Sequence, residues 1–509
     1  MRKHTFVLFF VWLIVIISFI TTQLTNDFFV FWAYGRSVTN STETGFGSLI
    51  DVWELKGLLF RAYIYAEYIV TAVFFPHFDI YGQIVYKSVG LVPYLMILAL
   101  STYLLPGKYV GGIIKKKDCF FISSILLLAV HFASHFQPEM WGVLLLIFSF
   151  TLYLHEGRTV KILSGIIFSL TFYLKSPIPL LGGSLVFAAM ILKRQNMKKM
   201  IKDVVPFAIT TVLFLSITLC LLLRYYPQEM DDIWNASYYQ HTLFHSYRNI
   251  FSSCLSLFRE GIKTILYNPI SLVGIVSFIL LETKWFRDKT LLNALGLIMV
   301  WLFPLIYIII SNCFFVYHYY LLAFSAILSL LILHNNRLEI KRSIIVPSFM
   351  FFVVYYMLTL SSVSPTNLYE REKYADCQKN LLEKEGIHVG CTLGEGEIMY
   401  LDAGMGAFFF ENRSYLRYFY PLPLQRTKST DEFVNMQTYK TIKKQALSYK
   451  GEYITLDKKW FLKNGNNNDV YEKITKEYNL YKQLVYSSYS WELFANTSAI
   501  DTLLVYRKR

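Results

Sequence analysis

The sequence predicts a polytopic α-helical membrane protein with about eleven spans, interfacial helices in its first outer loop and a C-terminal α/β domain outside the membrane. Of its 509 residues, 55% are hydrophobic, and its mean hydropathy is +0.40, which is too apolar for a soluble globule of this size. Runs of about 18 or more apolar residues recur between positions 6 and 360, each long enough to cross a ~30 Å hydrocarbon core. Between these runs, lysines and arginines gather in short loops.

The first apolar run begins just after the basic residues Arg2 and Lys3 and continues to Leu24. A cleaved signal peptide has a shorter apolar region and a cleavage site of small residues. Neither feature is present here. We therefore expect this run to be retained as the first span.

The loop charges give the predicted spans a topology. The eleven spans are placed at 5–24, 83–105, 119–136, 138–154, 159–175, 177–192, 203–223, 266–282, 290–310, 313–333 and 343–360. The basic loops then all fall on one side of the membrane, which the positive-inside rule makes cytoplasmic, together with the N-terminus. The net charge of +14 is accordingly interpreted as a topological bias, and no nucleic-acid partner is predicted.

Residues 55–76 test this scheme, because they are fairly apolar yet carry Lys56, Arg61 and Glu67. Counting them as a span would move the basic loop at 115–117 to the outside. We therefore predict one or two amphipathic helices in the membrane interface. The outer face then carries the first loop (25–82), a loop at 224–265 and the C-terminal domain.

Two domains follow from this layout: a transmembrane domain at 1–360 and an extracytoplasmic domain at 361–509. The second has a mixed pattern, with strands predicted at 387–391, 453–456 and 502–506 and helices at 381–385 and near 469–478. Cys377 and Cys391 both belong to it. A disulfide between them could persist outside the cytoplasm, and two free thiols are the alternative.

Ionisable groups at the membrane edge are costly, so each is a candidate for function. Asp27 follows the first span, and Glu139 lies in a corner between two spans that Pro138 helps to set. Two carboxylates near one pocket could serve as a general base and as an orienting group. The plainer interpretation of each is an exposed loop carboxylate.

Several cations share the predicted outer face with these carboxylates. Lys175 ends a span, Lys56 and Arg61 belong to the interfacial segment, and Arg248 lies in the 224–265 loop. Each could bind a substrate phosphate, or could simply extend its charge to the headgroups. His318, which opens a span among tyrosines, could donate a hydrogen bond to a phosphate or a sugar hydroxyl.

Nothing in the sequence predicts a cofactor. No nucleotide-binding loop or zinc-protease motif occurs in a convincing context, and the six cysteines show no metal-ligand spacing. We predict no metal site, and a divalent cation has no support.

Four short segments together resemble the GT-C superfamily, the multi-span glycosyltransferases that use polyprenyl-phosphate-linked sugars. They are Asn26-Asp27-Phe28-Phe29 after the first span, the Pro138-Glu139 corner, the span opening at 315–322, and 414–423 in the C-terminal domain. The likeness is to the branch of protein mannosyltransferases and lipid A aminoarabinose transferases. The family often has an acidic pair in the first loop, where this chain has Asn26 beside Asp27.

The resemblance implies a reaction and a set of roles. Asp27 would take the proton from an acceptor hydroxyl while the polyprenyl phosphate leaves, with inversion at the anomeric carbon. Lys175, Arg61 and His318 would neutralise the leaving phosphate. The implied partners are the lipid-linked donor, a glycan, lipid or protein acceptor, and the bilayer of a bacterial inner or plasma membrane, with the C-terminal domain extracytoplasmic.

Three other functions compete with this one. A transporter or flippase of lipid-linked sugars suits eleven spans, but the sequence shows no internal repeat. An O-antigen-type polymerase or ligase uses similar donors, but usually carries its large outer loop between late spans. A non-catalytic assembly subunit with a sensing domain is the third.

Overall fold

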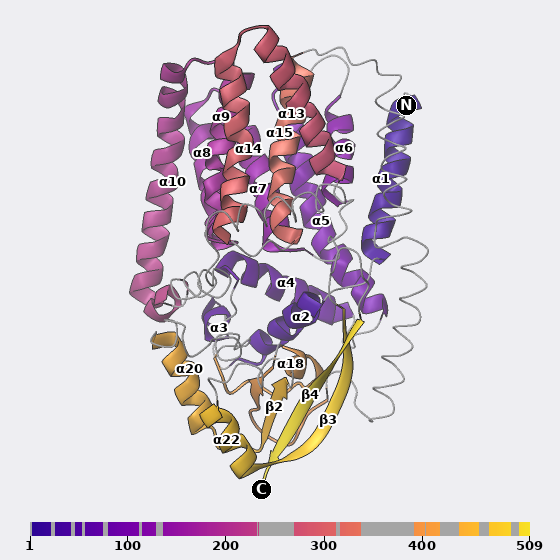
Figure 1. The fold of residues 1–509 in the computed structure, drawn as a ribbon, viewed down its shortest axis with the longest axis vertical. Coiled ribbons are helices and arrows are strands. Elements are labelled where there is room, and N and C mark those ends of the chain that lie inside the picture. The colour runs from indigo at the N-terminus through magenta and orange to yellow at the C-terminus, as the bar shows by residue number, and fades with distance from the viewer. Residues whose placement is uncertain are drawn as a thin grey trace. The chain divides into compact units, whose positions relative to one another are not determined.

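The computed structural model describes most of the chain (Figure 1). The described residues are 3–21, 26–41, 46–52, 56–74, 80–110, 115–128, 136–231, 233, 269–311, 316–336, 391–402, 404–417, 437–457, 468–489 and 498–509. Contacts divide the chain into two compact units. The helical unit comprises Met1–Thr22, Gly90–Cys220 and Tyr247–Pro365, and the mixed unit comprises Gln23–Val89, Leu221–Ser246 and Thr366–Arg509. Whereas the sequence suggested one boundary at 360/361, the first outer loop thus shares a unit with the C-terminal residues.

The helical unit is built from long apolar helices, several of which lie side by side in Figure 1. They are α1 (Lys3–Thr21), α5 (Ile80–Leu104, which begins in the mixed unit), α6 (Lys116–Leu128), α7 (Pro138–Tyr153), α8 (Arg158–Leu170), α9 (Gly182–Leu192), α10 (Met197–Tyr225), α13 (Pro269–Arg287), α14 (Leu291–Ser311) and α15 (Leu322–Asn335). Short 3-10 turns join some of them: η1 (Gly107–Tyr109), η2 (Thr171–Tyr173), η3 (Ile178–Leu181) and η4 (Val316–Leu321).

The predicted spans from 5–24 to 313–333 each overlap one of these helices, although residues 129–135 of the span at 119–136 lie outside the described part. The predicted span at 343–360 lies wholly outside it. Four described helices are long and apolar enough to cross a membrane, at Ile84–Leu104, Met197–Tyr225, Leu291–Ile309 and His318–Asn335. The total of eleven spans stays a prediction.

Two helices show the extremes of burial in the helical unit. α7 is buried along almost its whole length and packs against α8, α9 and η4. α10 is the opposite, since only 6% of its most apolar stretch is buried. Apolar side chains that a helix leaves uncovered on most of its surface suit contact with lipid. α7 can therefore carry a polar group into the interior.

The mixed unit combines helices with one sheet. Its described helices are α2 (Asn26–Thr39), α3 (Phe46–Asp51), α4 (Leu58–Phe74), α18 (Met405–Phe409), α20 (Gln437–Ser448) and α22 (Asn468–Glu477). The strands β1 (Met399–Leu401), β2 (Tyr453–Asp457), β3 (Tyr478–Tyr489) and β4 (Ser498–Lys508) pair in the order β1-β2-β4-β3. β1 and β2 are parallel, and the other pairs are antiparallel. Ile442, Ile474 and Leu456 lie in the core between the sheet and α20 and α22.

The α/β character of the C-terminal residues is thereby confirmed in the described part. The strands predicted at 453–456 and 502–506 and the helix near 469–478 are present. The segments predicted at 381–385 and 387–390 lie outside the described residues, and Cys377 does too. The disulfide between Cys377 and Cys391 therefore stays a prediction, and Cys391 Sγ donates to the Phe409 carbonyl oxygen at 3.7 Å.

Helix α4 forms within the segment predicted to be interfacial at 55–76, and its place in the membrane interface stays a prediction. An interfacial helix should turn its charges to water. α4 instead buries Arg61 and Glu67 and exposes Val73 and Phe74. Its charged face is therefore occupied by protein, and its apolar end is the side left open.

Candidate functional site

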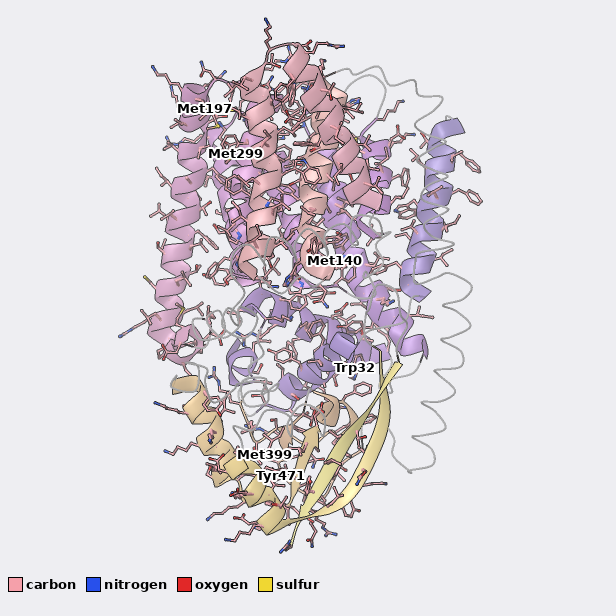
Figure 2. The ribbon with its side chains drawn as sticks, viewed as in Figure 1. Trp32, Met140, Met197, Met299, Met399 and Tyr471 are labelled. Atoms are coloured by element: carbon pink, nitrogen blue, oxygen red, sulfur yellow. The ribbon has the colours of Figure 1, made fainter. Side chains whose placement is uncertain are left out.

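The site in the helical unit begins at Glu139, in the first turn of α7. Gln137 precedes the helix and Pro138 occupies its first position, where the fixed φ of proline suits a helix start. A carboxylate in the first turn is stabilised by the partial positive charge of the helix N-terminus. Glu139 is fully buried, and a buried carboxylate needs partners. Figure 2 labels its neighbour Met140 at this end of α7.

Lys175 reaches Glu139 from the segment between η2 and η3. Its Nζ donates to Glu139 Oε1 at 2.6 Å. Gly142, one turn after Glu139, faces this segment, since a Cβ there would lie 2.7 Å from the end of the Ile178 side chain.

His318, in η4, is the third member. Lys175 Nζ lies 2.9 Å from His318 Nε2, and His318 Nε2 lies 3.6 Å from Glu139 Oε1. Because an ammonium can only donate, Nε2 accepts from it, and the neutral imidazole carries its proton on Nδ1. Three residues that the sequence nominated separately are therefore brought into contact.

Tyr307 of α14 completes the Glu139 cluster, the name used below for Glu139, Lys175, His318 and Tyr307. Its hydroxyl donates to Glu139 Oε1 at 3.5 Å. Its ring meets the His318 ring edge to face, with centroids 5.9 Å apart, and the Lys175 ammonium lies 5.9 Å from the ring centroid. Tyr307 was not predicted from the sequence, where its only signal was an aromatic residue with a polar hydroxyl inside an aliphatic run.

The second oxygen of Glu139 leaves the cluster able to accept a further hydrogen bond. Oε2 is buried and has no hydrogen-bond partner among the residues that the structure describes. An acceptor left in this state costs about 1–3 kcal/mol. A bound hydroxyl could satisfy it, while Lys175, whose side chain is 15% exposed, could contact an anionic oxygen.

Arg61 has a different environment from the one expected of a phosphate ligand. It is fully buried in the mixed unit, where its guanidinium pairs with Glu229 and donates to the Leu49 carbonyl at 2.9 Å. Arg417 lies 3.8 Å from the other oxygen of Glu229. Sequence reasoning missed Glu229, and a phosphate role for Arg61 stays a prediction.

The structure says less about the surroundings of the other predicted site residues. Lys56 is half-buried in the turn before α4. Asp27 lies in the first turn of α2, with its side chain outside the described part. Arg248 lies outside the described residues altogether.

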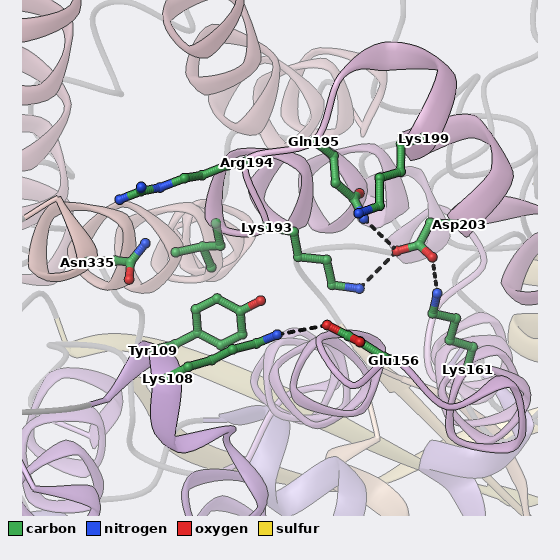
Figure 3. Close-up of a pocket in the computed structure, with 11 residues that line it drawn as sticks. Lys108, Tyr109, Glu156, Lys161, Lys193, Arg194, Gln195, Lys199, Asp203 and Asn335 are labelled. Carbon is green, nitrogen blue, oxygen red and sulfur yellow. Dashed lines mark hydrogen bonds and ion pairs between the residues drawn. The ribbon is translucent and has the colours of Figure 1, made fainter.

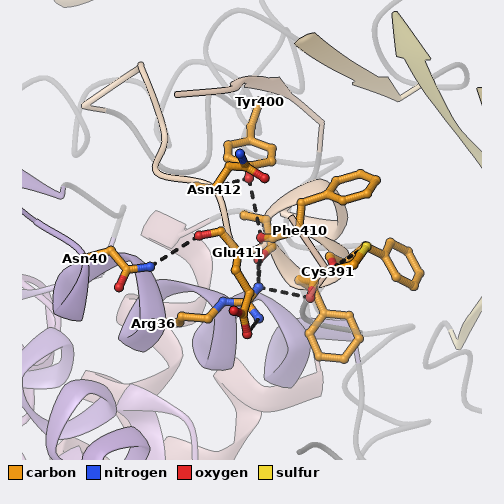
Figure 4. A network of polar contacts seen from close by, with 10 residues as sticks. Arg36, Asn40, Cys391, Tyr400, Phe410, Glu411 and Asn412 are labelled. Carbon is orange, nitrogen blue, oxygen red and sulfur yellow. Dashed lines mark hydrogen bonds and ion pairs between the residues drawn. The ribbon is translucent and has the colours of Figure 1, made fainter. Parts of the chain in front are cut away.

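Arg36 fixes the helix that carries Asp27 within the mixed unit (Figure 4). Its guanidinium donates to the carbonyls of Ala407, Phe408 and Phe410, the last two at 3.0 Å, and lies 3.6 Å from Glu411. Burial lowers the pKa of Arg36, and Glu411 opposes this. α2 is thus tied to the end of α18 by one buried cation.

Among the described residues, no group of three or more His, Cys, Asp or Glu side chains is placed to hold a metal ion.

Comparisons with known proteins give one distant likeness. No protein-family model matches the chain, and no curated protein matches it in sequence. The chain is similar to the crystal structure of the Archaeoglobus fulgidus oligosaccharyltransferase in the apo form, with 11% identity and a TM-score of 0.41, over 89% of this chain and 69% of that one. A likeness of this size assigns no role to any residue.

Proposed function

We propose that this protein is an integral-membrane glycosyltransferase that moves a sugar from a polyprenyl-phosphate-linked donor to a glycan, lipid or protein acceptor on the extracytoplasmic face. The observation that carries the proposal is the Glu139 cluster, in which a buried carboxylate, an ammonium and an imidazole meet beside apolar helices. The short segments that resemble the GT-C superfamily support the same conclusion.

Lys175 and His318 are assigned to the donor phosphate. When the bond between the anomeric carbon and the phosphate oxygen breaks, negative charge grows on that oxygen. A preorganised ammonium and an N–H donor stabilise such charge best where water is excluded. Glu139 Oε1 holds the Lys175 ammonium at 2.6 Å, so Glu139 orients the cation.

Asp27 is assigned as the general base. The acceptor oxygen forms a bond to the anomeric carbon on the face opposite the phosphate, its proton passes to the Asp27 carboxylate, and the polyprenyl phosphate leaves. The configuration is inverted. Asp27 is preferred to Glu139 because Lys175 already occupies one oxygen of Glu139, whereas Asp27 holds the position that the resemblance gives to the base.

The test uses purified full-length protein and a panel of synthetic polyprenyl-phosphate sugars, with release of polyprenyl phosphate as the readout. Asp27→Asn should lower turnover at least about a hundredfold, the usual size of general-base catalysis. Its binding of polyprenyl phosphate should be unchanged. The control is Asp288→Asn, which removes an exposed carboxylate and should behave as wild type.

Two outcomes would count against this function. Near wild-type turnover of Asp27→Asn would remove Asp27 as the base and make Glu139 the next residue to test. Movement of the intact donors across a bilayer without any release of polyprenyl phosphate would make the protein a transporter.

A further inference from the structure

A second polar site lies in the helical unit, in a cavity of about 390 Å³ (Figure 3). Its cationic lining residues come from four separate segments: Lys108 in η1, Lys161 in α8, Lys193 and Arg194 at the end of α9, and Lys199 in α10. Three basic loops that the sequence placed on one side of the membrane therefore meet in one pocket. This basic pocket shares no residue with the Glu139 cluster.

Only part of its positive charge is neutralised from within. Asp203 accepts from Lys161, and from Lys193 at 3.0 Å. The side chains of both lysines are less than a tenth exposed. Asp203 is thus shared between two buried cations, and this triad leaves one positive charge over.

Glu156, the other carboxylate that lines the pocket, neutralises little of the excess positive charge. Glu156 pairs with Lys108 at 3.0 Å, but the two side chains are 84% and 54% exposed, and exposed pairs are weak. Neither Arg194 nor Lys199 forms an ion pair with any described residue. With five cations and two carboxylates, the pocket has a formal excess of three positive charges.

Arg194 occupies a position where an arginine is unexpected. Its φ is 51°, in the left-handed region. The N–H of Gln195 bonds to the Met190 carbonyl at 3.0 Å, and the N–H of Arg194 bonds to the Ile191 carbonyl at 3.1 Å. This is the Schellman arrangement at a helix C-terminus, where glycine is the usual residue because it has no Cβ. The backbone at Arg194 is therefore strained, and the side chain at this strained position lines the pocket.

We propose that the basic pocket binds a phosphate group, carried either by an anionic lipid headgroup or by a free phosphate. Its volume suits a small ligand, an arginine and a lysine are the side chains that bind phosphate best, and basic pockets between membrane helices bind anionic headgroups. This proposal is independent of the glycosyltransferase function.

The chain offers a matched pair of variants. Arg194→Gly removes the guanidinium and relieves the backbone strain, so it should fold at least as well as wild type. Lys289 ends α13 in the same way, with φ 54° and the same two hydrogen bonds, from Thr290 to Trp285 and from Lys289 to Phe286. Lys289→Gly therefore relieves the same strain and removes a cation outside the pocket.

Binding is measured by isothermal titration calorimetry on the full chain in nonionic detergent. The probes are dihexanoyl phosphatidylglycerol below its micelle concentration, dihexanoyl phosphatidylcholine and inorganic phosphate. Wild type and Lys289→Gly should bind the anionic lipid or phosphate saturably, and Arg194→Gly at least about tenfold more weakly, the lower end for a charge-assisted hydrogen bond. Inorganic phosphate that competes at similar affinity would identify a free phosphate, and binding of phosphatidylglycerol alone would identify a lipid.

The proposal is overturned if neither phosphate-bearing anion binds saturably, or if phosphatidylcholine binds as well as phosphatidylglycerol. It is also overturned if Arg194→Gly binds like wild type, or if Lys289→Gly loses as much affinity as Arg194→Gly.

Discussion

Replacing Lys175 with methionine while Glu139 remains should expose how far the Glu139 cluster is desolvated. The two side chains are 15% and 1% exposed, and Nζ and Oε1 are 2.6 Å apart. Removing one partner of a buried ion pair leaves the other charge uncompensated, at a cost of about 3–5 kcal/mol. We therefore expect the free energy of unfolding to fall by about this amount in Lys175→Met.

The double variant Lys175→Met with Glu139→Gln should be more stable than Lys175→Met alone, because no charge is then buried without a partner. Glu139→Gln alone keeps the shape and leaves Lys175 partly hydrated, so we expect it to lose about 1.5–3 kcal/mol, the scale of a hydrogen bond to a charged group. The coupling energy of the cycle should be at least about 2 kcal/mol.

The assay is unfolding in mixed micelles, followed by tryptophan fluorescence on wild type, both single variants and the double variant. Lys108 and Glu156 form the control pair, since they are 3.0 Å apart but 54% and 84% exposed. Their cycle should give less than about 1 kcal/mol. A coupling for Lys175 and Glu139 no larger than that of the control would refute the view that Glu139 orients a desolvated lysine.

Two further predictions concern the mixed unit. Arg36→Met should make the mixed unit much less resistant to proteolysis, because three carbonyls lose one charged donor, at about 1.5–3 kcal/mol per bond at most. Arg36→Lys should recover part of the loss. Equal resistance of Arg36→Met and wild type would contradict the view that Arg36 holds α2 to α18. Burial raises the pKa of Glu67 from 4.5 to about 8, although hydrogen bonds from Tyr63 and Tyr86 lower it. Since the folded pKa lies above the unfolded one, the stability contributed by the neutral carboxyl is fully present below about pH 4.5 and is lost as the pH rises through about 8. Glu67→Gln cannot ionise, so its melting temperature should fall less than that of wild type between pH 5 and 9, and parallel curves would count against this protonation.

The helices of the helical unit were predictable from their long apolar runs, because a segment that crosses lipid must satisfy its own backbone and does so as a helix. The strand at 453–456 was also readable, since a short run of β-formers had turn residues at both ends. β3 (Tyr478–Tyr489) was missed, because Lys482, Gln483 and two serines dilute its pattern. Its pairing with β4 along most of its length is a tertiary effect that outweighs local propensity.

The candidate site was predictable residue by residue but not as a whole. Glu139, Lys175 and His318 each stood out because an ionisable group at a span end is costly. Their contacts join positions 36 and 143 residues apart, and one sequence gives no register for such distant contacts. Arg61 was expected at the membrane interface because its partner Glu229 lies 168 residues away. A contact that distant could not be foreseen from one sequence.

The hydrogen bonds from Arg36 to the end of α18 have a consequence for the synthesis of the protein. Its acceptor Ala407 lies 371 residues further along the chain. At the usual rate of about 5–20 residues per second, the ribosome reaches Ala407 roughly 20–75 s after Arg36. Throughout that interval α2 exists without the carbonyls that later surround its arginine. A nascent chain that stalls before Ala407 would therefore present this helix to proteases and chaperones without those carbonyls, and rare codons between positions 36 and 407 would prolong that exposure.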